Sequence, residues 1–298
     1  MTLINHIRKL VFSILFISFC FPAVAQINYG MTGLMNMPTA DMQRDKTFMA
    51  GGMWLNHHGT VPRWWYDTWN YSINITIFPW LEIGYLCQGH KAVPTDYGNI
   101  SGYWVPDTYG RFINQDRSFH GRLRVWKEGW WKKWMPQIVV GANDVLQSTG
   151  ETGPSEQGYG NGFMNRYFVA ITKHFDFQNI GTLGAHLTWI YSKRFDNTLN
   201  DPAVGANFKF NLPASAWWRK AINGFNVMAE VTPGYTDVRE DLTFDPDGPK
   251  YQANIGFTYN SLAAFSPKTM KRFEVEAVFE LNRCKYVSAG LVMKVHLK

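Results

Sequence analysis

The stretch from Trp69 to Phe78 reads W-N-Y-S-I-N-I-T-I-F, and its side chains alternate between two kinds. Aromatic residues and isoleucines form one set, and asparagine, serine and threonine form the other. A period of two predicts a β-strand, because successive side chains of a strand point to opposite faces of the sheet. A soluble two-layer protein would bury the isoleucine face, whereas an outer-membrane barrel would turn it to lipid and the polar face to a wet interior. One strand fits both architectures; only a repeat of the pattern along the chain can separate them.

The same alternation returns along the rest of the chain. The alternating runs span residues 47–57, 69–78, 81–88, 118–125, 137–143, 166–172, 182–191, 204–210, 225–231, 251–259, 273–281 and 287–297. Strands of roughly nine to eleven residues are long enough to cross an outer membrane at a tilt. An even number of strands returns both chain ends to the periplasm, and closure leaves no unpaired strand edge in lipid. We therefore expect an all-β fold, a transmembrane antiparallel β-barrel of about 12 strands formed by residues 47–298.

The first 25 residues predict export from the cytoplasm. His6, Arg8 and Lys9 give a basic start, an apolar run follows at 10–21, and A-V-A at 23–25 supplies the small residues that a signal peptidase reads. The run is too short to span a bilayer, so residues 1–25 are expected to be a cleaved signal peptide. Together with a barrel, this signal places the mature chain in the cell outer membrane of a Gram-negative bacterium.

Residues 26–46 have no clear period and hold G-L-M-N-M-P-T-A-D-M-Q at 33–43, a run broken by Pro38. We expect this N-terminal segment either to form an ordered approach to the first strand or to insert into the lumen. About twelve strands enclose more space than the eight that side chains alone can fill, so a plug or a water-filled volume is expected.

Aromatic residues make up 16% of the chain, with 13 tryptophans, which is typical of Trp and Tyr girdles at the two membrane interfaces. Two connections on the expected inner side, W-K-E-G-W-W-K-K-W at 126–134 and W-W-R-K at 217–220, suit amphipathic elements at the headgroup surface. After loss of Arg8 and Lys9 the chain holds 27 basic and 23 acidic residues. This mild excess of positive charge gives no indication of nucleic-acid binding.

The sequence contains no set of residues that predicts catalysis, because G-x-S-x-G, H-E-x-x-H, Walker and C-x-x-C patterns are all missing. We therefore expect no enzyme activity, no cofactor and no metal site. The neighbouring residues His57 and His58 fit solvated loop positions better than metal ligands. Cys87 and Cys284 could pair in an oxidising periplasm, although two cysteines form no disulfide framework.

Charged residues recur on the inward face of the predicted strands. The expected lumen charge network consists of Glu82, Arg122, Arg124, Glu230, Glu274, Glu276, Glu280 and Lys294. Arg166 and Lys209 also fall on inward positions. Isolated charges are costly in a narrow interior, so we expect pairs across strands, with Glu274 nearly opposite Lys294. Two roles remain open for the network: it pins the barrel shut, or it lines a polar conduit.

Aromatic residues also gather in the connections expected on the outer side. Trp64, Trp65, Tyr103 and Trp104 lie there beside carboxylate and amide side chains, and exposed aromatic faces of this kind can stack on sugar rings. The same residues suit an outer aromatic girdle, so glycan stacking and membrane anchoring both remain open.

The run at 33–43 resembles the N-terminal signature G-[LI]-x-x-[MIV]-P-[ST]-A of YjbH-like outer-membrane proteins, a group that includes GfcD-like proteins of capsule operons. N-Q-D-R-S-F at 114–119, R-L-R-V at 122–125 and N-R-C-K-Y-V-S-A-G-L at 282–291 are similar to short Bacteroidetes-type members. This resemblance implies an outer-membrane barrel tied to exopolysaccharide production or export, with no enzymatic residues to carry over. The larger family members are much longer than this chain.

The leading interpretation is a non-enzymatic outer-membrane barrel that assists exopolysaccharide or capsule secretion or assembly. Its expected partners are outer-membrane lipid, surface polysaccharide and periplasmic export proteins. The alternative is an outer-membrane porin or channel for small solutes. An outer-membrane lipid hydrolase would need serine and histidine side chains on the outward face, and the apolar faces of the predicted strands offer none.

Overall fold

The computed structural model describes residues 28–56, 67–91, 113–147, 166–194, 197–234, 250–266 and 272–297. Three sequence-based predictions fall outside these ranges. They concern the signal peptide at 1–25, the two histidines His57 and His58, and the candidate glycan-stacking residues Trp64, Trp65, Tyr103 and Trp104.

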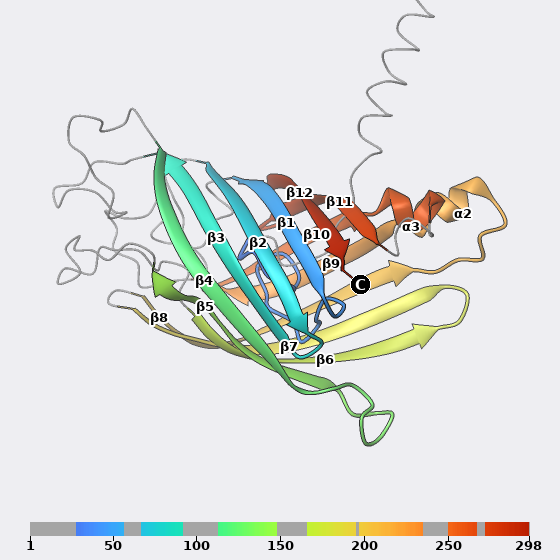
Figure 1. Ribbon diagram of the computed structural model, residues 1–298, viewed down its shortest axis with the longest axis horizontal. Helices are drawn as coiled ribbons and strands as arrows, with labels where there is room; N and C mark the ends of the chain where they lie inside the picture. The colour runs from blue at the N-terminus through green and yellow to red at the C-terminus, as the bar shows by residue number, and fades with distance from the viewer. Residues whose placement is uncertain are drawn as a thin grey trace, which may run out of the picture.

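Twelve antiparallel strands form one closed barrel (Figure 1). The strands are β1 (Thr47–Leu55), β2 (Thr68–Phe78), β3 (Leu81–Lys91), β4 (Ile113–Trp126), β5 (Gln137–Gln147), β6 (Arg166–Phe177), β7 (Gly181–Arg194), β8 (Asn197–Phe210), β9 (Phe225–Pro233), β10 (Tyr251–Tyr259), β11 (Phe273–Asn282) and β12 (Tyr286–His296). Each strand pairs with its neighbours in sequence, and β1 closes the barrel on β12, with Thr47 facing His296. The predicted all-β antiparallel barrel is confirmed, and its differences from the alternating runs are confined to strand ends.

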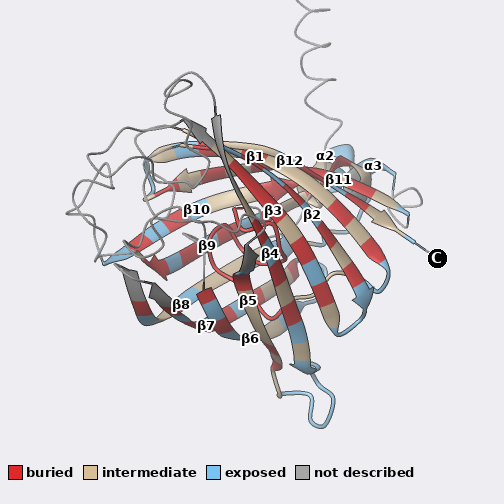
Figure 2. Cartoon of the chain, turned by 60° about the vertical axis from the view of Figure 1, so that its left-hand side comes forward, coloured by how far each residue is buried: buried red, intermediate tan, exposed pale blue. Residues whose placement is uncertain are grey.

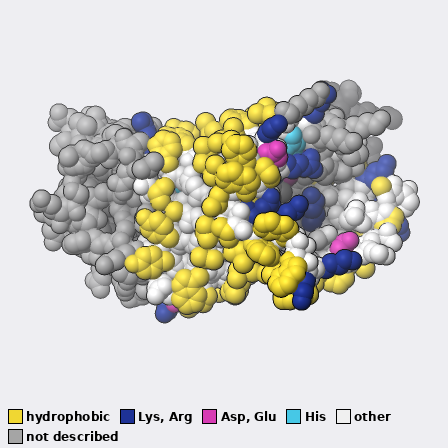
Figure 3. Space-filling view, turned by 60° about the horizontal axis from the view of Figure 1, so that its bottom comes forward, with side chains coloured by type: hydrophobic (Ala, Val, Ile, Leu, Met, Phe, Trp, Pro, Cys, Tyr) yellow, Lys and Arg dark blue, Asp and Glu magenta, His cyan; other side chains and the backbone are white. Residues whose placement is uncertain are grey.

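The two faces of β2 show how the alternation is used. Trp69 is 61% exposed and Ile73 is 44% exposed, while Asn70 and Asn74 are buried at 5% and 1%. The apolar face therefore points outward and the polar face points inward, which is the reverse of a soluble two-layer protein. Buried and exposed residues alternate along the other strands in the same way (Figure 2). Figure 3 shows hydrophobic side chains gathered over the middle of the outside surface of the barrel wall.

Two short helices mark one end of the barrel, which we call the inner end; the opposite end is the outer end. The helix α2 (Trp217–Ile222) follows β8, and α3 (Ser261–Phe265) follows β10 (Figure 1). Neither of these described helices is long and apolar enough to cross a membrane. The Trp-rich connection between β4 and β5 lies at the inner end too, because β4, β8 and β10 run in the same direction.

The gap between the alternating runs at 182–191 and 204–210 predicts an outer loop over residues 193–201, and this prediction is wrong. Strand β7 continues to Arg194 and β8 begins at Asn197, with register pairs running from Gly181–Phe210 to Arg194–Asn197. The run N-T-L-N-D-P at 197–202 has the composition of a turn. Its residues nevertheless face partners on β7, and ladder pairing satisfies backbone groups whatever the side chain is.

The chain from 28 to 40 lies inside the barrel, and every residue in it is buried (Figure 1). The segment doubles back at a tight turn, in which the Leu34 N–H donates to the Met37 carbonyl at 2.9 Å. Its apolar side chains pack against inward-facing residues of the strands. This interior cluster comprises Leu34, Met35, Met37, Ile190, Ala203 and Met228. We call residues 28–41 the plug segment.

Candidate functional site

The contacts between the plug segment and the barrel wall form the candidate site. The turn of the plug segment sits on the carboxylate of Glu230, a residue of β9 that is 3% exposed. This carboxylate accepts hydrogen bonds from three consecutive backbone N–H groups, those of Met35 (3.1 Å), Asn36 (2.8 Å) and Met37 (3.0 Å). Asn254 of β10 donates a fourth hydrogen bond at 2.9 Å. Hydrogen bonds to an ionised acceptor are among the strong ones, so Glu230 is a principal anchor of the turn.

A second carboxylate, that of Glu82 on β3, holds the plug segment on the other side of the turn. It accepts from both the backbone N–H and the side-chain hydroxyl of Thr32, each at 3.0 Å. Asn74 on the neighbouring strand β2 donates to the same carboxylate at 2.6 Å. Glu82 is fully buried, so its charge is balanced by donors within the protein and not by bulk water.

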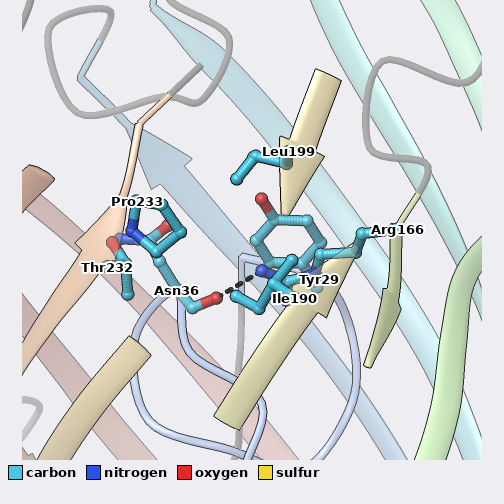
Figure 4. Close-up of a pocket in the computed structure, with 7 residues that line it drawn as sticks. All are labelled: Tyr29, Asn36, Arg166, Ile190, Leu199, Thr232 and Pro233. Atoms are coloured by element: carbon cyan, nitrogen blue, oxygen red, sulfur yellow. Dashed lines mark hydrogen bonds between the residues drawn. The ribbon is translucent and has the colours of Figure 1, made fainter. Parts of the chain in front are cut away.

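Two arginines bind backbone carbonyl groups of the plug segment, which the carboxylates cannot bind. Arg122 of β4 donates to the carbonyl oxygens of Thr32 and Thr39, and to that of Asp41 at 2.6 Å. Arg166 of β6 donates to the Asn36 carbonyl at 2.7 Å (Figure 4). The barrel wall thus offers acids to the N–H groups of the plug segment and arginines to its carbonyls.

Arg166 also closes the space on the outer side of the turn. Its guanidinium carbon lies 3.3 Å from the ring centroid of Tyr29, over the ring face, in a cation–π contact. The cavity beside these two residues measures about 10 Å³. Its lining residues are Tyr29, Asn36, Arg166, Ile190, Leu199, Thr232 and Pro233 (Figure 4). A volume of about this size holds at most one water molecule, so it offers no passage past the turn.

Neutral side chains complete the attachment around the wall. The Ala40 N–H donates to the Thr172 hydroxyl at 2.9 Å, and the Thr188 hydroxyl donates to the Pro38 carbonyl at 2.6 Å. On the opposite wall the Asn28 side chain donates to Glu280 at 3.1 Å. The anchors described here come from β3, β4, β6, β7, β9 and β11, so the plug segment is held from most directions around the barrel.

At the inner end the plug segment is joined to the β4–β5 connection through His174 of β6. His174 Nε2 lies 3.3 Å from Asp41 Oδ1, and His174 Nδ1 lies 2.7 Å from Glu128 Oε2. Lys173 Nζ contacts the other Glu128 oxygen at 2.7 Å. An imidazole placed between two carboxylates can donate to both only when it is protonated, which assigns a positive charge to His174. We call Asp41, His174 and Glu128 the inner latch.

The electrostatics of the inner latch favour the ionised carboxylates. Burial raises the pKa of the Asp41 carboxyl, but the hydrogen bond with His174 and the nearby charge of Arg122 hold that pKa below its usual value. Burial likewise raises the pKa of Glu128, and the hydrogen bonds from Lys173 and His174 outweigh that effect and lower it. Both acids are therefore charged at neutral pH.

The remaining acids of the predicted network gather on β11. Glu274 lies 2.7 Å from His296 Nε2, and Asn260 donates to both Glu274 (3.1 Å) and Glu276 (3.0 Å). The register places Lys294 directly opposite Glu274, as expected from the sequence. The contact that Glu274 makes at ion-pair distance, however, is with His296 and not with Lys294.

The predicted network therefore divides into two groups. Glu82, Arg122 and Glu230 bind backbone atoms of the plug segment, and Glu82 also stands opposite Arg122 in the β3–β4 ladder. Glu274, Glu276, Glu280 and Lys294 line β11 and β12. Arg124 lies two residues further along β4 toward the inner end and is only partly buried.

Sequence reasoning missed several residues of the site. Arg166 was assigned to the inward face by its alternation alone, without a role. Asp41 and Glu128 gave no signal, because neither lies on an alternating run and their common partner His174 is far away in sequence. The described cysteines, Cys87 and Cys284, form no disulfide; Cys87 is buried and Cys284 exposed.

Comparisons with known proteins match one family. The family model described as "YjbH: Exopolysaccharide biosynthesis protein YbjH" matches residues 25–203, more than half of the chain. The "Uncharacterized lipoprotein YjbH" of Escherichia coli (strain K12) is 31% identical over 123 residues. That alignment covers 41% of this chain and 14% of the lipoprotein, so the chain spans only a small part of its relative's length.

The solved structures that match this chain do so with low similarity. The outer membrane protein Omp33 of Acinetobacter baumannii matches with a TM-score of 0.34 and 9% identity, covering 85% of this chain and 99% of its own. LpxR from Salmonella typhimurium matches with a TM-score of 0.38 and 9% identity, covering 84% and 100%. OprB of Pseudomonas putida, in its low-pH structure, matches with a TM-score of 0.31 and 9% identity, covering 84% and 91%.

Proposed function

Because the chain belongs to the YjbH family of exopolysaccharide biosynthesis proteins, we propose that it is a non-enzymatic outer-membrane β-barrel that assists the secretion or assembly of exopolysaccharide or capsule. Its proposed location is the outer membrane of a Gram-negative bacterium. Its proposed partners are outer-membrane lipid, surface polysaccharide and periplasmic export proteins.

The polarity of the wall supports the membrane location. Large apolar side chains such as Val169 (45%), Leu187 (47%) and Val204 (50%) are exposed on the outside of neighbouring strands. In water such a continuous apolar belt would drive aggregation, whereas lipid accepts it. The inner end adds the exposed side chains Trp131 and Trp217, whose rings suit the headgroup level.

The filled interior is the observation that carries the assisting role. An open conduit for a polymer needs a continuous wet passage, and the plug segment occupies the lumen with hydrogen bonds to strands that include β3, β4, β6, β7, β9 and β11. A barrel closed in this way supports a role as a membrane-embedded partner of an export machinery. The alternative, a porin for small solutes, would require the plug segment to leave or to shift.

Deletion of the gene tests the proposal. We expect the deletion strain to carry less surface polysaccharide, and a plasmid copy of the wild-type gene to restore it. Uptake of small solutes, measured in the same strains, should not change. Normal surface polysaccharide together with slowed solute uptake would overturn the proposal and favour the porin alternative.

A further inference from the structure

The β4–β5 ladder contains a large bulge near the middle of the wall. Phe119 pairs with Leu146 and Gly121 pairs with Ala142, so three residues of β5 stand opposite one residue of β4, His120. One of these three residues, Asp144, has a positive φ of 56°. Its N–H donates to His120 Nδ1 at 3.0 Å, which fixes the bulge from the lumen side. Bulges of this kind re-aim side chains and often lie next to functional sites.

The same bulge is tied to the interior of the barrel. Asn143, the first bulged residue, accepts a hydrogen bond from Arg166 Nε at 2.9 Å and contacts the Met31 sulfur at 3.4 Å. Arg166 in turn binds the plug segment. The bulge is therefore part of the ordered structure and not a local irregularity.

On the outside the bulge leaves a groove of about 400 Å³ in the apolar wall. Apolar residues of four strands line it, among them Ile73, Ile75, Ile83, Phe119, Gly121 and Val145. Gly121 forms its floor between two exposed neighbours on β4, and a Cβ atom added there would meet no other atom within 4 Å. The volume falls in the range of about 300–1,000 Å³ that is common for small-ligand sites.

A cation stands at the outer side of this groove. Arg117 lies two residues before Phe119 on the same outward face of β4, close to the outer end where that strand begins. It faces Cys87 of β3, which faces Tyr71 of β2. An arginine on a lipid-facing wall is costly at mid-membrane but can extend its guanidinium to the headgroup level.

We propose that the groove holds an acyl chain of a phosphorylated lipid from the leaflet at the outer end, with the lipid phosphate on Arg117. The guanidinium can bind phosphate oxygens in a bidentate manner, and Tyr71, two strands away in the same register, supplies a further hydroxyl donor. The apolar lining excludes the headgroup, so chain and phosphate are recognised by different parts of the site. This inference rests on the proposed outer-membrane location and adds a ligand to it.

Lipid retention by the purified protein tests the inference. Wild-type barrel is reconstituted in phosphatidylcholine vesicles that contain a small fraction of bis-phosphorylated lipid A, then extracted into a mild detergent. Native mass spectrometry counts the lipids that stay bound. We expect wild-type protein to retain one phosphorylated lipid in preference to phosphatidylcholine.

Two variants address the two parts of the site. Arg117→Gln removes the phosphate partner, and Gly121→Phe fills the groove; each should lower retention at least about tenfold, the equivalent of roughly 1.4 kcal/mol. Arg117→Lys should keep part of the binding. Val169→Phe, which places the same phenylalanine on the outward face of β6 away from the groove, should leave retention unchanged. Heat-modifiable migration on gels shows that each variant is a folded barrel.

Equal retention by wild type, Arg117→Gln and Gly121→Phe would overturn the inference, as would equal retention of phosphatidylcholine and lipid A. These results would leave the polysaccharide role untouched, because retention is measured in vitro without the export machinery. Conversely, a deletion strain with normal polysaccharide would remove the proposed function without affecting a lipid retained through Arg117.

Discussion

At the scale of single residues, the plug segment depends on charges that bind backbone atoms. Glu230 accepts three consecutive N–H groups, and Arg122 donates to three carbonyls. Such contacts explain why the sequence reveals the inward charges but not their partners. Alternation places Glu230 on the inward face, yet a backbone N–H is the same in every residue and leaves no mark at Met35, Asn36 or Met37.

Glu230→Gln tests the anchor of the turn with almost no change in shape. The neutral amide has one acceptor oxygen, and its NH₂ group would face a backbone N–H, so we expect a loss of about 2 kcal/mol in the free energy of unfolding. Urea unfolding of the barrel in detergent micelles measures this loss. Glu280→Gln is the matched control, since Glu280 meets the plug segment through the Asn28 side chain, and its effect should be smaller. Equal effects of the two changes would contradict the special role of Glu230.

At the scale of elements, the strands follow from periodicity and the irregular pieces do not. Each strand separates two media, so polar and apolar residues must alternate along it, and β2 or β12 can be recognised by reading alone. The paired run at 197–202 was misread because pairing overrides a turn-like composition. The plug segment and the β4–β5 connection have no period, and their meeting at His174 joins positions that are distant in sequence.

The inner latch predicts a dependence of stability on pH. The pKa values of Asp41 and Glu128 are both lowered in the folded protein. A carboxyl group whose pKa is lower in the folded than in the unfolded state stabilises the fold while it is ionised. This contribution is complete above the pKa of the unfolded state, about 4, and is lost as the pH falls through the pKa of the folded state. We therefore expect the barrel to lose stability as the medium is acidified below about pH 4, where both carboxylates take up protons.

Unfolding measured from neutral to acidic pH checks this expectation in wild type and in Glu128→Gln. The variant cannot lose a charge at position 128, so its stability should be lower at neutral pH and should fall less on acidification. A variant curve parallel to that of the wild type over the whole acidic range would show that Glu128 does not contribute as described.

At the scale of the whole molecule, a barrel and a segment inside it form one structure. The strands close on themselves through β1 and β12, and the plug segment then fills the space that twelve strands leave. The sequence predicted the closed wall. It did not decide between two states of the interior, one pinned shut by charges and one that conducts. The contacts of Glu82, Arg122, Arg166 and Glu230 favour the closed form, because they hold the plug segment across the lumen.

Planar-bilayer conductance of the purified protein tests this closure most directly. Wild-type protein should show no steady, large conductance, whereas deletion of residues 28–41 should produce one, because it removes the segment that fills the lumen. Heat-modifiable migration on gels confirms that both proteins are folded barrels. A wild-type protein that conducts steadily, at a level which the deletion does not raise, would contradict the closed barrel.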